Sequence, residues 1–182
     1  MKRIALVLIA ALAGGCAGIG PAPQPRAFDL GIAAPQARLQ PLRPVTVRAA
    51  APFDGVEMHY RLAWRNAAEL SAFTQSRWAA TPAELLRKQL LRASGEGLAK
   101  CGVEIELQEF SQVFASPQAS EAKIELQASL AGPKGRIAAR SWRISEPNGG
   151  AEAAGGAAAL ARATDAAVGE IAGWVAAQPE CR

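Results

Sequence analysis

The sequence has few of the residues on which most enzymes depend. Among its 182 residues it has one histidine (His59), one tyrosine (Tyr60), two methionines and three cysteines. No GxSxG segment supplies a nucleophile for His59, and no second histidine or CxxC pair supports a metal site. The glycine-rich segments lack the spacing of phosphate-binding loops. We therefore expect a protein that is not an enzyme and that holds no metal or other cofactor.

The sequence also lacks an apolar run long enough to span a membrane, and the run near its N-terminus is a short one. Ile4 to Ala13 is a run of ten apolar residues, about half of what a helix needs to span a bilayer. It follows Lys2 and Arg3 and precedes Gly14-Gly15-Cys16, an order typical of bacterial lipoprotein signals. We predict a lipoprotein signal peptide over residues 1–15 and lipidation of Cys16. Ordinary cleavage that leaves a soluble periplasmic protein is the alternative.

Removal of this signal leaves little net charge. Without Lys2 and Arg3, the 20 basic residues fall to 18, against 16 acidic ones. Such a balance gives no reason to expect a nucleic-acid partner. Residues 16–26 are rich in Gly and Pro, so we predict a flexible tether. Residues 27–178 have the length of a single domain, and we predict a tail over 179–182.

Cys101 and Cys181 are the two cysteines that remain after Cys16. Export would place them in an oxidising compartment, where a disulfide between them could form. Closing a loop of about 80 residues would stabilise the fold by roughly 4 kcal/mol in the chain-entropy model. Two unpaired thiols are the alternative, and the sequence leaves both open.

Apolar patterning predicts strands in the first part of the chain. Short strands are expected over 28–31 and 45–48, and a longer one over 56–64. A turn at Arg65-Asn66 would pair this longer strand with 69–74 in a hairpin. A helical turn over 69–74 is the alternative.

The clearest helix start in the sequence is Thr81-Pro82-Ala83-Glu84. Threonine can cap a backbone N–H, proline suits the first helical position and glutamate completes a capping box. We expect the helix to run toward Cys101, with Gly102 at its end. Its apolar stripe comprises Leu86, Leu90, Ala93 and then Gly97 or Leu98.

The second half of the chain predicts three strands and a helix. The runs 103–114, 124–130 and 136–144 are joined by short turns, which indicates an antiparallel meander. The apolar parity changes after Leu107, which suggests a bulge. A small-residue linker over 149–156 then precedes an Ala-rich helix over 157–177.

These elements together predict an α+β fold. We expect a two-layer domain with one mixed, largely antiparallel sheet and two main helices packed on it. The aromatic residues of these elements could belong either to the core or to an interface. The candidates are Tyr60, Trp78, Phe110, Phe114, Trp142 and Trp174.

Several segments together resemble the ABC-type transport auxiliary lipoprotein family, which includes the PqiC-like proteins. The segments cover most of the mature chain in order. They are the lipidation signal, Phe28–Gly31, Met58–Arg61, Ser76–Leu86, Leu107–Phe114 and the Ala-rich helix that ends in Trp174-Val175. One departure is that Cys101-Gly102 runs almost directly into the strand at Val103, where a longer connection is expected.

The resemblance implies a non-enzymatic role in lipid transport. Family members accompany Mce/MlaE-type ABC systems that move lipids or other hydrophobic molecules between the inner and outer membranes. A member would be held on a membrane by its lipid, face the periplasm and dock an Mce-domain protein with its permease/ATPase complex. A homo-oligomer is also expected from the resemblance. Because Ala17 stands where an aspartate retains enterobacterial lipoproteins in the inner membrane, the outer membrane is favoured.

Two other classes of function stay open at this point. The chain could be a lipoprotein that itself binds a lipid or solute, which requires an apolar cavity between the sheet and the helices. It could also be an assembly or structural lipoprotein of the cell envelope.

Overall fold

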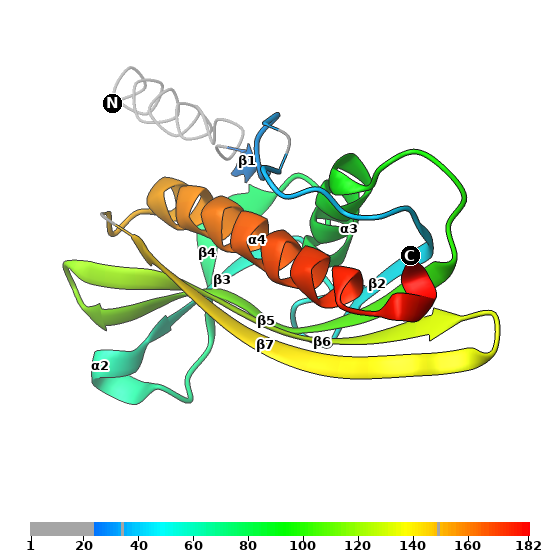
Figure 1. The fold of residues 1–182 in the computed structure, drawn as a ribbon. Coiled ribbons are helices and arrows are strands. Elements are labelled where there is room, and N and C mark those ends of the chain that lie inside the picture. The colour runs from blue at the N-terminus through cyan, green and yellow to red at the C-terminus, as the bar shows by residue number, and fades with distance from the viewer. Residues whose placement is uncertain (1–23, 34, 149) are drawn as a thin grey trace, which may run out of the picture.

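A computed structural model describes residues 24–33, 35–148 and 150–182. A mixed sheet of seven strands forms one layer, and the two longer helices pack on one face of it (Figure 1). This confirms the predicted α+β class. The signal peptide and Cys16 lie outside the described residues.

Seven strands make up the sheet. They are β1 (Arg26–Phe28), β2 (Leu42–Ala49), β3 (Glu57–Leu62), β4 (Ser71–Trp78), β5 (Cys101–Ser116), β6 (Ala119–Gly132) and β7 (Gly135–Asn148). The helices are α2 (Ala63–Asn66), α3 (Pro82–Ala93), α4 (Ala153–Ala176) and the 3-10 turn η1 (Pro179–Cys181). None of the described helices is both long enough and apolar enough to cross a membrane.

The long strand β5 organises the sheet. β6 and β7 follow it as an antiparallel meander, as predicted. On its other side, β2 pairs in parallel with the first half of β5, and β3 pairs in parallel with the second half. The strand order is β1-β4-β3-β5-β6-β7, with β2 beside β5. The predicted bulge is confirmed, because the β5–β6 register shifts between Leu107 and Glu109.

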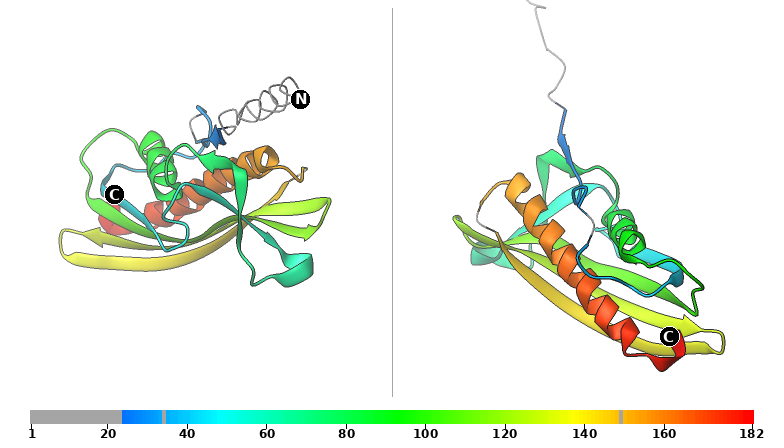
Figure 2. Two further views of the ribbon diagram at one scale, coloured as in Figure 1. Left: turned by 180° about the vertical axis from the view of Figure 1, so that it is seen from behind. Right: turned by 45° about the horizontal axis from the view of Figure 1, so that its top comes forward.

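Alternation along the meander creates the core. Every second residue of β6 from Ile124 to Leu130 is buried on the face that the helices cover, and the residues that alternate with them face the opposite side. α4 packs on β5, β6 and β7, whereas α3 packs on β2 (Figures 1 and 2). The buried stripe of α4 contains the apolar residues that its sequence predicts, including Leu160, Val168 and Ile171.

The hairpin predicted in the first half is present. β3 and β4 pair antiparallel, and the short helix α2 follows β3 in the connection between them. The first strand differs from the prediction, because β1 ends at Phe28. The Asp29 carboxylate accepts a hydrogen bond from the Gly31 N–H at 2.8 Å, and Gly31 has a φ of +82°. This local turn ends the strand.

Helix α3 starts where predicted but ends early. The Thr81 hydroxyl accepts a hydrogen bond from the Glu84 N–H at 3.3 Å, which confirms the cap. The helix stops at Ala93 and does not reach Cys101. Ser94 is extended, and Gly97 has a φ of +124° that no helix permits. Leu98 is consequently 94% exposed and does not belong to the buried stripe.

Helix α4 begins at Ala153, within the segment expected to be a linker. Gly155 and Gly156 lie in its first turn, against the side chains of Asn148 and Gln112. A Cβ on Gly156 would meet the buried side chain of Gln112, so the glycines allow the helix to approach the sheet closely. They therefore serve packing and not a flexible connection.

The C-terminal residues are part of the folded domain. Residues 179–182, where we predicted a tail, include η1, and Cys181 is buried there. Cys181 forms a disulfide with Cys101, the first residue of β5. Of the two alternatives that the sequence left open, the structure has the disulfide.

Candidate docking surfaces

The structure places most of the candidate aromatic residues in the core. Trp78, Phe110, Phe114, Trp142 and Trp174 are between 1% and 7% exposed. Tyr60 is half-buried. In this chain these residues are therefore packing residues, and only Tyr60 keeps a substantial part of its side chain accessible.

Two edge-to-face ring pairs join separate elements. The ring of Trp78 lies 5.3 Å from that of Phe110, which joins β4 to β5. The rings of Trp142 in β7 and Trp174 in α4 are also 5.3 Å apart, and this contact holds α4 on the sheet. Pairs of this geometry stabilise a fold beyond their burial alone.

The single histidine has surroundings that suit a structural role. His59 of β3 is half-buried and lies edge-on to Phe53 at 5.3 Å. Burial lowers its pKa, although the nearby Glu57 and Glu109 carboxylates act in the opposite direction. Among the described residues, no three His, Cys, Asp or Glu side chains come together as a metal site.

Surface hollows are lined by a mixture of charged and apolar residues. One of the larger hollows lies around Arg43, Lys100, Glu104 and Arg136. Another follows α3, with Asp29, Glu84, Arg87, Lys88, Leu91 and Arg92 in its lining. Between the helices and the sheet, by contrast, buried apolar side chains form the core.

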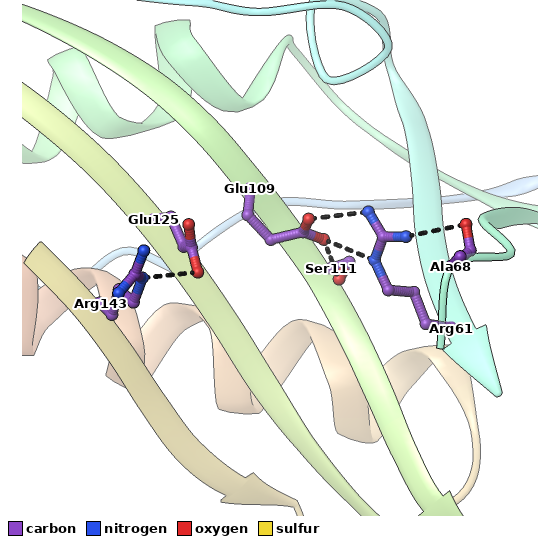
Figure 3. Close-up of polar contacts among 6 residues, drawn as sticks. All are labelled: Arg61, Ala68, Glu109, Ser111, Glu125 and Arg143. Atoms are coloured by element: carbon purple, nitrogen blue, oxygen red, sulfur yellow. Dashed lines mark hydrogen bonds and ion pairs between the residues drawn. The ribbon is translucent and has the colours of Figure 1, made fainter. Parts of the chain in front are cut away.

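The sheet face opposite the helices is polar and carries ion pairs (Figure 3). Arg61 of β3 donates to both Glu109 carboxylate oxygens of β5, at 2.8 and 3.3 Å. The Ser111 hydroxyl donates to the same carboxylate, and Arg61 also donates to the Ala68 carbonyl. These contacts fix the hairpin that carries α2 against β5. We call this side of the sheet the open face.

Further charges continue the open face across the meander. Arg143 of β7 pairs with Glu125 of β6 at 3.1 Å (Figure 3). Within β6, Lys123 pairs with Glu121 at 2.8 Å. Because these pairs are largely exposed, each adds little stability. Their importance lies in the pattern, which gives the open face interspersed charges of both signs.

One exposed tryptophan lies beside this face. Trp64 of α2 is 49% exposed, and the Arg65 guanidinium lies 5.7 Å from its ring centre. Figure 1 shows α2 on the side of the sheet opposite α4 and β1. Exposed tryptophan and arginine are the residues that most often dominate binding at protein interfaces.

Trp64 is not among the aromatic residues that the sequence pattern selects as candidates. The sequence feature that could have identified Trp64 is its position directly before Arg65-Asn66, at the turn of the predicted hairpin. A side chain at a hairpin tip has few neighbours to cover it, whereas Trp78 and Trp174 lie within long elements. Tertiary packing on these elements buries the other aromatics and leaves Trp64 accessible.

Comparison with solved structures identifies this fold. The protein XCC0632 from Xanthomonas campestris, of the family model DUF330, matches with a TM-score of 0.65 and 24% identity, over 79% of this chain and 94% of that one. An uncharacterized protein matches with a TM-score of 0.64 and 13% identity, over 84% of this chain and 99% of that one. These likenesses show a shared fold.

Comparison by sequence adds nothing to this result. No family model matches the chain, and no curated protein does.

Proposed function

We propose that the protein is a periplasm-facing lipoprotein, anchored to a membrane through Cys16. In this proposal it is a non-catalytic auxiliary component of an Mce/MlaE-type ABC system that moves lipids or other hydrophobic molecules between the inner and outer membranes. The membrane that holds it is the outer one.

The observation that carries the proposal is that the segments similar to the ABC-type transport auxiliary lipoprotein family pack together in one core. Ser76–Leu86 contains the end of β4 and the start of α3, and Leu107–Phe114 is the second half of β5. Trp78 from the first segment packs on Phe110 from the second, and Met58 is buried in the same cluster. Segments far apart in sequence thus form a common scaffold, which supports a family relationship.

The arrangement of the elements supports a docking role. β1 lies on the side of the helices, whereas the open face and α2 lie on the other side (Figure 1). The ten residues from Cys16 to Arg26 could extend at most about 35 Å. A domain tethered at β1 can therefore present its open face and Trp64 away from the anchoring membrane, toward an Mce-domain partner.

The packing between the layers gives no support to a role as a lipid carrier. Such a role needs an apolar cavity large enough to surround a ligand. Here Leu86, Leu107 and Leu160 are among the side chains that fill the interior, each no more than 2% exposed. This leaves docking as the function that the described residues suit best.

Co-purification tests the proposed partner. The tagged protein is isolated from membranes in mild detergent, and mass spectrometry is expected to find an Mce-domain protein together with a permease and an ATPase. Trp64→Ala with Arg65→Ala should weaken this recovery, because both side chains are exposed on α2. Leu98→Ala is the matched control, since Leu98 is 94% exposed in the connection between α3 and β5.

The proposal fails if no Mce-domain protein is enriched over an unrelated tagged lipoprotein. The anchor is examined in the same cells. The wild-type chain should stay with membranes after a salt wash. Cys16→Ser should abolish lipid labelling, and any Cys16→Ser chain from which the signal is removed should be released. A Cys16→Ser protein that remains processed and membrane-bound would contradict anchoring through this cysteine.

A further inference from the structure

Strand β7 forms a long edge of the sheet. It has 14 residues and pairs with β6 alone in the part of the chain that the structure describes. The opposite edges are shorter, with three residues in β1 and eight in β2. An edge strand exposes unpaired backbone N–H and C=O groups, to which another strand can pair.

Pro147 shows which backbone groups of β7 face this edge. It lies opposite Glu121 of β6 but has no N–H to give, and its carbonyl accepts a hydrogen bond from Arg162 at 2.7 Å. This identifies its pair with Glu121 as a non-hydrogen-bonded one. The register is constant from Ala138 to Asn148. Hydrogen-bonded and non-hydrogen-bonded pairs alternate along an antiparallel ladder. Every second residue before Pro147 therefore directs its N–H and C=O groups away from β6, and these residues are Ala139, Ser141, Arg143 and Ser145.

The charges along β7 restrict what can pair with it. If β7 pairs antiparallel with β7 of a second copy, registers centred on Arg140 or Arg143 bring identical arginines face to face. A register centred on Ser141 avoids both. It places Arg140 opposite Trp142 of the second copy, on the side of the sheet that the helices cover.

This register matches contacts that the strand already makes. The Arg140 guanidinium lies 5.3 Å from the ring of Trp142 in its own chain, so the same cation–π contact can form between copies. Ala138 would lie opposite Ile144, which pairs two apolar side chains. Pairing β7 with the β2 edge of another copy is less favourable, because exposed Arg43 and Arg48 would approach the β7 arginines.

Helix α4 leaves room for a second copy. It packs over β6 and β7, and neighbouring strands are about 4.8 Å apart. Across a shared β7 edge, two α4 helices would thus lie about 10 Å apart, near the usual distance for packed helices. The exposed positions of α4 include the small residues Ala158, Gly173 and Ala176. Two exposed charged residues of α4 also lie toward this edge, since Arg162 donates to the Pro147 carbonyl and Glu170 pairs with Arg140 at 3.9 Å.

We propose that two copies of the chain pair through β7, antiparallel about a twofold axis at Ser141, to form one continuous sheet. The open face and Trp64 remain accessible on each copy. The dimer would therefore present two docking surfaces, but the proposal does not depend on the identity of the partner.

Cross-linking of introduced cysteines tests the register. In the mature chain with Cys16→Ser, Cys101 and Cys181 are joined to each other, so an added cysteine is the only free thiol. Ser141→Cys is expected to give a covalent dimer with a short bismaleimide. Ser145→Cys is the matched control, because Ser145 is exposed on the same strand face yet about 26 Å from its counterpart.

The two variants give clear outcomes. Dimer from Ser141→Cys and monomer from Ser145→Cys would support the proposal. Equal cross-linking of both, or of neither, would overturn it.

A proline variant tests the backbone pairing separately. Ala139→Pro removes an outward N–H that β6 does not use, so the variant should fold with an unchanged circular dichroism spectrum. By sedimentation, the parent chain is expected to be a dimer and Ala139→Pro a monomer, whereas Ala139→Val, which keeps the N–H, should remain a dimer. A monomeric parent chain, or a dimeric proline variant, would contradict the proposal. If Ala139→Pro does not fold, the cysteine pair decides.

Discussion

At the scale of single residues, burial separates tryptophans that the sequence treats alike. Trp78 is 1% exposed and packs on Phe110, whereas Trp64 is 49% exposed on a four-residue helix. The first stabilises the junction between β4, α3 and the sheet, and the second is free to bind a partner. Substitution of each should therefore affect a different property of the protein.

We expect Trp78→Ala, or Phe110→Ala, to lower the free energy of unfolding by about 3–5 kcal/mol, because each removes a large buried ring. Urea denaturation followed by circular dichroism measures this. Trp64→Ala is the control and should change the free energy of unfolding by less than about 0.5 kcal/mol. Near-wild-type stability of both ring deletions, with loss of partner recovery, would instead make these residues part of an interface.

At the scale of elements, the start of α4 depends on a polar cluster of the sheet. The Gln112 amide donates to the Ser120 hydroxyl at 2.9 Å, and the Asn148 amide donates to the Gly150 carbonyl at 2.6 Å. Gly156 brings the first turn of the helix against Gln112. Without a side chain at this position, the helix can lie close to β5 and still leave these hydrogen bonds intact.

Gly156→Ala is expected to destabilise the protein by about 1–3 kcal/mol, as overpacking does. The added Cβ would clash with the Gln112 Oε1 atom, so the buried amide must move and lose its hydrogen bonds. Gly173→Ala is the matched control in the same helix. Its Cβ meets nothing within 4 Å, so better helix propensity should stabilise the protein by up to about 1 kcal/mol.

A double-mutant cycle checks the cause of this loss. In a Gln112→Ala background, most of the cost of Gly156→Ala should disappear, because the clashing side chain is gone. An unchanged cost in that background would show that the two residues do not act through this contact.

At the scale of the whole molecule, the disulfide joins the two halves of the fold. Cys101 starts the central strand β5, and Cys181 lies just after α4. The bond therefore joins the C-terminal end of α4 to the start of the central strand β5. Both cysteines are buried, which protects the bond from reductants in the folded protein.

Loss of this bond should weaken the whole domain. Cys181→Ser is expected to lower the free energy of unfolding by about 4 kcal/mol, the chain-entropy value for a loop of 80 residues. Reduction of the wild-type chain with dithiothreitol should give a similar loss, and the variant should not respond to the reductant. Equal stability of the oxidised and reduced wild-type proteins would contradict this account.

Local sequence patterns determined much of this fold. The capping residues fixed the start of α3, alternation fixed the meander of β5 to β7, and the change of parity after Leu107 placed the bulge. Each signal depends on neighbours within a few residues, so it can be read without the fold. The paucity of histidine and cysteine likewise set the expectation of a non-catalytic protein.

Only the tertiary structure decided the features that depend on distant partners. It joined Cys101 to Cys181 and set Gly156 against Gln112, so that α4 begins within the expected linker. It also buried Trp78 while leaving Trp64 exposed beside the open face. Burial and pairing between distant segments are set when the layers pack, and no local pattern records which side chains that packing will cover.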